Sequence, residues 1–292
     1  MLERHVDPRL AEARVLLAGD SHAETGFDVS RWDRGLNVAL RGEPLVATLH
    51  KLRFLTPRAP ALEEIVVSVG PQSIARFRDG HLEGGPGASR LLERLYGVMP
   101  FWTLGDTPVS RELAFAASLR KWWSPDLHLI QDQVGRPARE HPYANGFVPR
   151  EGSDLSDETF HATMSMHYPE GDPRTSTIQM RMLDSIVDHG RAAGVRVTLV
   201  RTPLHARYRQ AVPGPVQVAL DSLLDTYRRE GSARVVDLHQ VPFADSLFSD
   251  FNHLTGAGAR VLSDMIVAAD PGGGSCPHRV PLTSTDGTAS RC

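Results

Sequence analysis

The feature that most constrains this chain is a short apolar run, Val15-Leu-Leu-Ala18, that ends in Gly19-Asp-Ser-His22. A continuous apolar run of this length, closed by turn residues, is typical of a strand buried on both faces of a parallel sheet. Ligands and reactive groups gather at the carboxyl ends of such strands. We therefore expect Ser21 to lie at the edge of a functional crevice.

Strand and helix patterns then alternate along the chain. Besides the first run, strands are predicted over 36–40, 64–70, 195–200 and 234–238, and helices over 43–55, 176–193, 216–229 and 256–269. Parallel neighbours need crossover connections, which cover both faces of the sheet with helices. The sequence thus predicts an α/β fold, a three-layer α/β/α sandwich around a central, mostly parallel, five-stranded sheet.

The domain organisation follows from where this alternation stops. Residues 1–269 are predicted to form a single α/β domain, with an insertion at about 79–175 where Gly and Pro breaks interrupt the pattern and Trp102, Trp122 and Trp123 gather. Residues 270–292 are rich in Gly, Ser, Thr and Pro, so we expect a disordered tail there.

Composition excludes several classes of protein. The net charge is -3 and no dense run of Lys or Arg occurs, which argues against a nucleic-acid partner. The two cysteines, Cys276 and Cys292, lie in the tail, far from the predicted core. The densest group of metal-ligand types, His161, His167, Glu170 and Asp172, lacks any recognised zinc spacing. We expect neither a metal nor a cofactor.

The N-terminal residues carry no secretory signal, because Met1 to Ala13 is charged and lacks an apolar stretch. No window reaches the ~18 apolar residues of a membrane span. The expectation is a cytoplasmic protein, or one whose N-terminal membrane anchor is missing from a truncated start. The oligomeric state stays open.

A second polar motif supplies what a nucleophilic serine would need. Asp250 and His253 lie three residues apart in a loop just before the last predicted helix. A serine hydroxyl becomes a useful nucleophile when a histidine takes its proton, and that histidine needs a carboxylate to fix its tautomer. Gly-Asp-Ser alone is more often an ordinary turn, but the pairing with Asp-x-x-His favours a triad. Asp20 is predicted to cap the following helix or to brace the turn.

These residues resemble the first and last sequence blocks of the SGNH/GDSL hydrolases. Gly19-Asp-Ser-His22 and the later Thr202-Pro-Leu-His-Ala-Arg-Tyr208 more narrowly resemble SGNH-like proteins of bacterial cell-surface or exopolysaccharide loci. The resemblance spans residues 14 to 269 in the order of elements and implies a flavodoxin-like sheet, with Ser21 as nucleophile, His253 as general base and Asp250 as its orienting acid. It also implies an oxyanion hole from Ser21 and Gly42. The third family block, Gly-x-Asn-Asp, is replaced by Gly70-Pro-Gln72, so Gln72 is the candidate third donor.

Two functions from different classes stay open at this point. The first is a serine-dependent esterase or O-acyl (acetyl) transferase that acts on a small-molecule or carbohydrate ester through an acyl-enzyme. The second is a catalytically inert SGNH-like module that binds carbohydrate or assists polysaccharide assembly, suggested by the missing Asn. His22 and His205 are candidate substrate-binding residues, although a loop histidine is more often structural.

Overall fold

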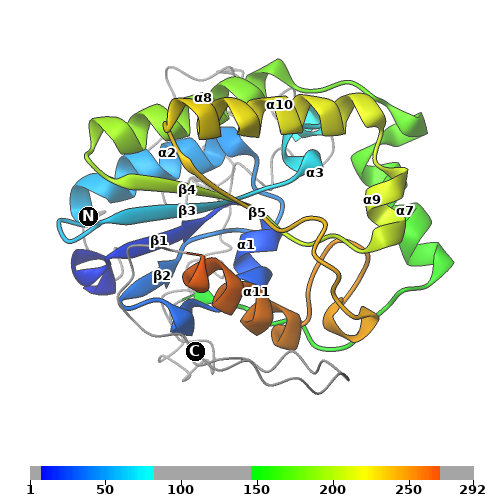
Figure 1. Cartoon of the computed structure of the whole chain (residues 1–292), viewed down its shortest axis with the longest axis horizontal. Helices are drawn as coiled ribbons and strands as arrows, with labels where there is room; N and C mark the ends of the chain where they lie inside the picture. Colours follow the sequence, from blue (N-terminus) through cyan, green and yellow to red (C-terminus); the bar gives the residue numbers. More distant parts are fainter. Residues whose placement is uncertain (1–7, 82–145, 270–292) are drawn as a thin grey trace, which may run out of the picture.

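The computed structural model describes residues 8–81 and 146–269, and its centre is a five-stranded parallel sheet (Figure 1). The strand order is β2-β1-β3-β4-β5, and every neighbouring pair is parallel. This is the flavodoxin-like order of a doubly wound fold. The strands are β1 (Val15–Ala18), β2 (Gly35–Asn37), β3 (Glu64–Val69), β4 (Arg196–Arg201) and β5 (Arg234–Asp237). The predicted α/β fold with five strands is confirmed.

Helices cover both faces of this sheet, with α2, α8 and α10 over one face and α1 and α11 over the other (Figure 1). The helices are α1 (Ser21–Gly26), α2 (Leu45–Leu55), α3 (Pro71–Ile74), α7 (Asp157–His167), α8 (Thr177–Ala192), α9 (Ala206–Ala211), α10 (Gly214–Glu230) and α11 (Gly256–Ala268). Short 3-10 helices occur at Pro8–Glu12, Val29–Arg31, Thr56–Arg58, Arg76–His81, Pro169–Gly171 and Asp245–Leu247.

Alternate strand residues build two separate cores, which explains the continuous apolar runs in the sequence. In β1, Leu16 points into the core under α2 and α8, whereas Leu17 points into the core under α1 and α11. In β3, Ile65 and Val66 divide in the same way. All residues of β1 and β3 are buried. A strand covered on both faces has no place for a solvated side chain, so the alternation typical of an exposed sheet is missing.

The turn after β1 depends on a glycine. Gly19 has a φ of +123°, and a Cβ atom there would lie 2.4 Å from Ser68 Oγ of β3. Only glycine meets both demands at low cost. The chain can therefore turn sharply out of the sheet and begin α1 at Ser21.

A strap, residues 146–150, runs along the side of the sheet that α1 and α11 cover. Gly146 has a φ of +86°, and a Cβ there would lie 2.0 Å from the Asn37 carbonyl oxygen. Val148 N donates to the Glu24 carbonyl at 3.1 Å, and the Arg150 carbonyl accepts from Gly256 N at 2.9 Å. The strap is thereby fixed between α1 and α11.

Two of the predicted domain features lie wholly or partly outside the described residues. Residues 82–145 of the predicted insertion and the predicted disordered tail, 270–292, are in this category. The described end of the insertion contains the strap and α7. None of the helices in the described ranges combines the length and the apolar character needed to cross a bilayer.

The loop that carries Gly42 is anchored by a buried ion pair. Lys51 of α2 places its ammonium 2.5 Å from Glu43 Oε2 and also donates to the Val38 carbonyl. Both side chains are almost fully buried. Burial raises the pKa of Glu43 even with Lys51 beside it, so the carboxylate would be still less tolerable alone.

Replacing Lys51 with Met should therefore destabilise the protein by about 3–5 kcal/mol, because it leaves an uncompensated buried carboxylate. The free energy of unfolding in urea measures the effect. The double variant Lys51→Met with Glu43→Gln removes the unpaired charge and should recover most of the loss. A single variant that loses no more than the ~1 kcal/mol expected of an exposed pair would contradict this assignment.

Candidate functional site

The hydroxyl of Ser21 lies at the carboxyl end of β1, at the first position of α1. Asp20 is the N-cap residue of that helix, and its side chain accepts from His22 N at 3.0 Å. The sequence predicted this capping role, and it is confirmed. Ser21 is buried, and its own N–H has no acceptor within the helix because it belongs to the first turn.

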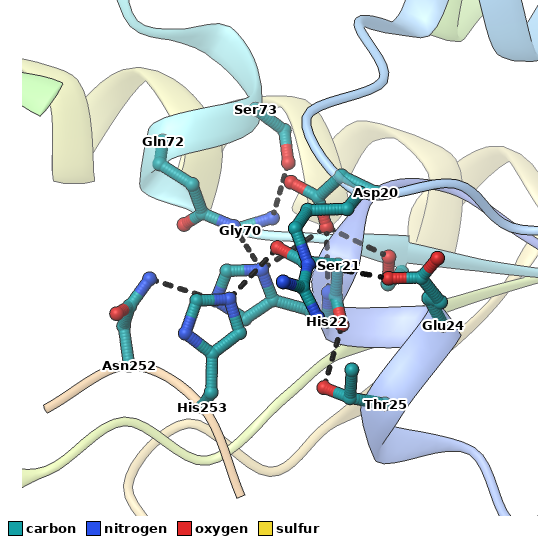
Figure 2. A network of polar contacts seen from close by, with 12 residues as sticks. Asp20, Ser21, His22, Glu24, Thr25, Gly70, Gln72, Ser73, Asn252 and His253 are labelled. Carbon is teal, nitrogen blue, oxygen red and sulfur yellow. Dashed lines mark hydrogen bonds and ion pairs between the residues drawn. The ribbon is translucent and has the colours of Figure 1, made fainter. Parts of the chain in front are cut away.

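Ser21 and His253 are brought together from opposite ends of the chain. Ser21 Oγ lies 2.7 Å from His253 Nε2 (Figure 2). The other ring nitrogen, Nδ1, lies 2.9 Å from each carboxylate oxygen of Asp250. These distances are within hydrogen-bond reach for a nucleophile, its base and the acid that orients the base.

The loop before α11 holds Asp250 and His253 in this geometry. Asp250 Oδ1 accepts the backbone N–H of Asn252 at 3.0 Å and that of His253 at 2.8 Å. Thr255 then caps α11 by accepting from Gly258 N. The carboxylate thus closes one turn of chain and faces the imidazole of the residue three positions on, as the Asp-x-x-His spacing indicates.

Arg150, at the end of the strap, is a member of this group that sequence analysis missed. Its Nη1 lies 2.5 Å from Asp250 Oδ2. Burial acts to raise the pKa of Asp250, but contacts with His253, the Asn252 N–H and Arg150 hold that pKa well below its usual range. The carboxylate is therefore charged at neutral pH.

The imidazole of His253 is neutral at physiological pH. Burial lowers its pKa to about 4, aided by the nearby His22 and Arg150 and opposed by Asp250. A neutral Nε2 with Nδ1–H directed at Asp250 can accept the proton of the Ser21 hydroxyl. The three groups are thus in the protonation states that nucleophilic attack requires.

Gly42 lies on a segment that runs beside the turn after β1. Leu40 N donates to the Gly19 carbonyl at 3.1 Å, which continues the pairing of β2 with β1 past the strand end. Gly42 has a φ of +75°, and its carbonyl accepts from Arg78 Nη1 at 3.0 Å. This carbonyl is therefore occupied by the protein's own guanidinium.

Gln72 lies on α3 at the carboxyl end of β3 and is buried. Its Nε2 lies 3.2 Å from His22 Nδ1, and its Oε1 is buried without a hydrogen-bond partner. The carboxamide therefore contacts the ring of His22, the residue that follows Ser21 (Figure 2).

Arg78 joins the segments that carry the candidate oxyanion donors. Its guanidinium is buried and donates to Asp20 Oδ2 at 2.6 Å, to the Gln72 carbonyl at 3.1 Å and to the Gly42 carbonyl. One side chain thus ties the turns after β1 and β3 to the Gly42 segment. Its sequence context, Arg76-Phe-Arg78-Asp, gives no sign of this role.

The two candidate substrate-binding histidines are used within the protein. His22 is 5% exposed, with Nδ1 facing Asp20 and Nε2 facing Asn252 Nδ2 at 3.3 Å. His205 is the N-cap of α9, where Nδ1 accepts from Arg207 N at 3.2 Å and Nε2 lies 3.3 Å from Asp245. Both nitrogens of each ring therefore have partners within the protein, and a role of either ring in binding substrate stays a prediction.

The influence of Arg150 on the base can be measured directly. Removing its positive charge in Arg150→Met should move the protonation midpoint of His253 upward from about 4, because a nearby cation disfavours the imidazolium. The imidazole C–H resonances in an NMR pH titration give that midpoint. Arg191→Met, which removes an exposed arginine from α8, is the matched control. An unchanged or lower midpoint in Arg150→Met would refute the proposed coupling.

Comparisons with known proteins find matches among solved structures alone. No known protein family and no curated protein sequence matches the chain. A search of solved structures finds a "putative acylhydrolase" from Bacteroides fragilis, with 13% identity and a TM-score of 0.44 over 92% of this chain and 91% of that one.

Proposed function

We propose that this protein is a serine-dependent esterase or O-acyl transferase. The observation that carries the proposal is the 2.7 Å contact between Ser21 Oγ and His253 Nε2, with Asp250 on the other side of the imidazole. A nucleophile, a neutral base and a charged orienting acid in one line are the parts of an acyl-transfer triad.

In the first half-reaction His253 Nε2 removes the hydroxyl proton as Ser21 Oγ attacks the ester carbonyl. The Oγ–C bond forms, and the carbonyl π electrons move onto oxygen to give a tetrahedral oxyanion. Collapse of that intermediate breaks the bond to the leaving alcohol, which takes the proton from His253. The product is an acyl-Ser21 and a free alcohol.

In the second half-reaction a water or a sugar hydroxyl attacks the acyl group. His253 removes the proton of that nucleophile and returns a proton to Ser21 Oγ when the second tetrahedral intermediate collapses. Water gives hydrolysis, and a sugar hydroxyl gives transfer. Asp250 stabilises the imidazolium formed in each half without itself taking a proton.

The proposed oxyanion donors are the backbone N–H of Ser21, that of Gly42 and the carboxamide of Gln72. The position of Ser21 at the start of α1 supports the first, and burial of Gln72 against His22, which stacks on His253, supports the third. Donors fixed in a water-poor site stabilise developing negative charge without reorganisation.

The proposed substrate is an ester of a small acyl group, such as an acetyl group on a carbohydrate. The support for this is the resemblance of the Gly-Asp-Ser and Asp-x-x-His motifs to SGNH/GDSL hydrolases. The alternative is an inert binding module, and the observation that favours it is the presence of Gln72 where the family has Asn.

Hydrolysis of 4-nitrophenyl acetate tests the proposal. The wild type should release nitrophenolate, and Ser21→Ala should lose at least about 10⁴-fold in kcat/KM because no acyl-enzyme can form. Ser185→Ala, at a half-buried serine of α8, should match the wild type. Equal turnover by the wild type and Ser21→Ala would end the hypothesis.

A fluorophosphonate probe separates an activated serine from an inert one. The wild type should be labelled at Ser21, and His253→Ala should lose labelling because its serine has no base. Mass spectrometry of the labelled peptide identifies the site. Absence of labelling in the folded wild type would favour the inert binding module.

A further inference from the structure

We propose that His22 is a positioning residue and does not contact the substrate. Its Nδ1–H donates to the carboxamide oxygen of Gln72, and the NH₂ group of Gln72 is then free to donate to the oxyanion. This inference rests on the proposed function and deepens it, because it says how glutamine can serve where the family pattern has asparagine. It also assigns a use to a histidine next to the nucleophile.

The first step is the tautomer of His22. Nδ1 lies 3.0 Å from Asp20 Oδ1. Burial acts to raise the pKa of Asp20, but contacts with His22 and the guanidinium of Arg78 hold it well below its usual range, so this oxygen is an acceptor. An acceptor at this distance requires a proton on Nδ1.

The second step is the direction of the Gln72 amide. With a proton on His22 Nδ1, an NH₂ group 3.2 Å away would set two donors against each other. The carboxamide oxygen and nitrogen exchange places on a half-turn about the terminal bond, and the hydrogen-bond network decides between them. The oxygen therefore faces His22, which shares its Nδ1–H between Asp20 and Gln72.

The third step concerns what this orientation leaves free. In the opposite orientation Oε1 is a buried acceptor without a partner. After the half-turn the NH₂ group occupies that buried position, where no hydrogen bond to another described residue is formed in the opposite orientation. A buried donor without a partner is costly in the resting protein and is satisfied when an oxyanion arrives.

Gly70 leaves space for the side chain of Gln72, and Arg78 fixes its backbone. Gly70 lacks a side chain where one would collide, since a Cβ there would lie 2.4 Å from Gln72 Oε1. The Gln72 carbonyl is held by Arg78 Nε at 3.1 Å. The longer side chain of glutamine thus folds back over Gly70 and stays in contact with the His22 ring.

The same ring touches the base. His22 and His253 stack with ring centroids 4.6 Å apart and an angle of 24° between planes. His22 Nε2, which has a lone pair in the Nδ1–H tautomer, can accept from Asn252 Nδ2, whose backbone N–H donates to Asp250 (Figure 2). His22 therefore links Gln72 to the loop that carries the base.

Two substitutions at position 22 separate the donor from the ring. His22→Asn keeps a donor close to the position of Nδ1 and loses the ring, whereas His22→Phe keeps a ring against His253 and loses the donor. We expect His22→Phe to lower kcat at least about 10-fold, a part of the ~10²–10³ that an oxyanion donor is worth, with KM little changed. His22→Asn should recover most of that loss. A His22→Phe variant as active as the wild type, or His22→Asn as the worse of the two, would overturn the inference.

A double-mutant cycle tests whether His22 acts through Gln72. Gln72→Ala alone should lower kcat, and adding His22→Phe should cost little more, because the group that His22 positions is already absent. Thermal unfolding of each variant shows that it is folded. Losses that multiply in the double variant would mean that His22 acts independently of Gln72.

The tautomer itself has a readout that needs no activity. In ¹⁵N NMR of the wild type at neutral pH, His22 should show a protonated Nδ1, with His22→Asn assigning the signals. An unprotonated Nδ1 would refute the inference whatever the enzyme does. If Nδ1 is protonated but neither ester nor fluorophosphonate reacts at Ser21, the proposed function fails while the positioning of Gln72 stands.

Discussion

A carboxylate removed from water must find both positive charge and hydrogen-bond donors, and the buried Asp20 imposes this demand at the carboxyl edge of the sheet. Arg78 supplies the charge, and the backbone and ring of His22 supply donors. The same guanidinium of Arg78 also donates hydrogen bonds to the backbone carbonyls of Gly42 and Gln72. Satisfying one buried charge therefore fixes the turn after β1, the Gly42 segment and α3 relative to one another.

The sheet topology makes this convergence possible. In the order β2-β1-β3-β4-β5, β1 and β3 are neighbours, so the turns that follow them meet at one edge although 50 residues separate His22 from Gln72. The loop before α11 reaches the same edge from the far end of the chain. Two histidines then stack there, and each faces an aspartate through Nδ1 that is in turn paired with an arginine. The pairing differs at Nε2, which meets a serine hydroxyl at His253 and an amide at His22.

Most of the framework could be predicted from local pattern. The apolar runs of β1 and β3 and the helical spacing of α8 and α11 are local signals. A strand buried on both faces has consecutive apolar residues, and a helix buried along one stripe has apolar residues at helical spacing. The pairing of Gly-Asp-Ser with Asp-x-x-His likewise indicated which residues meet. Arg78 and Arg150 could not be found in this way, since their partners lie 58 and 100 residues away and an arginine in sequence most often means a solvated surface. The sequence left open whether His22 lines the pocket, because the contacts of its two ring nitrogens with Asp20 and Asn252 involve positions that no local pattern connects.

The proposed role of Gln72 depends on the path of its side chain, which is one methylene longer than the asparagine of the sequence block that it resembles. One extra methylene would carry a carboxamide past the position that the shorter residue occupies, unless the chain folds back. Gly70 provides the space for that fold, and Pro71 begins α3 so that the backbone of Gln72 is helical. In the proposed orientation the ring of His22 donates to the returning oxygen, and the NH₂ group of Gln72 is left as a donor. This arrangement requires a glycine two residues before Gln72 and a protonated Nδ1 on His22.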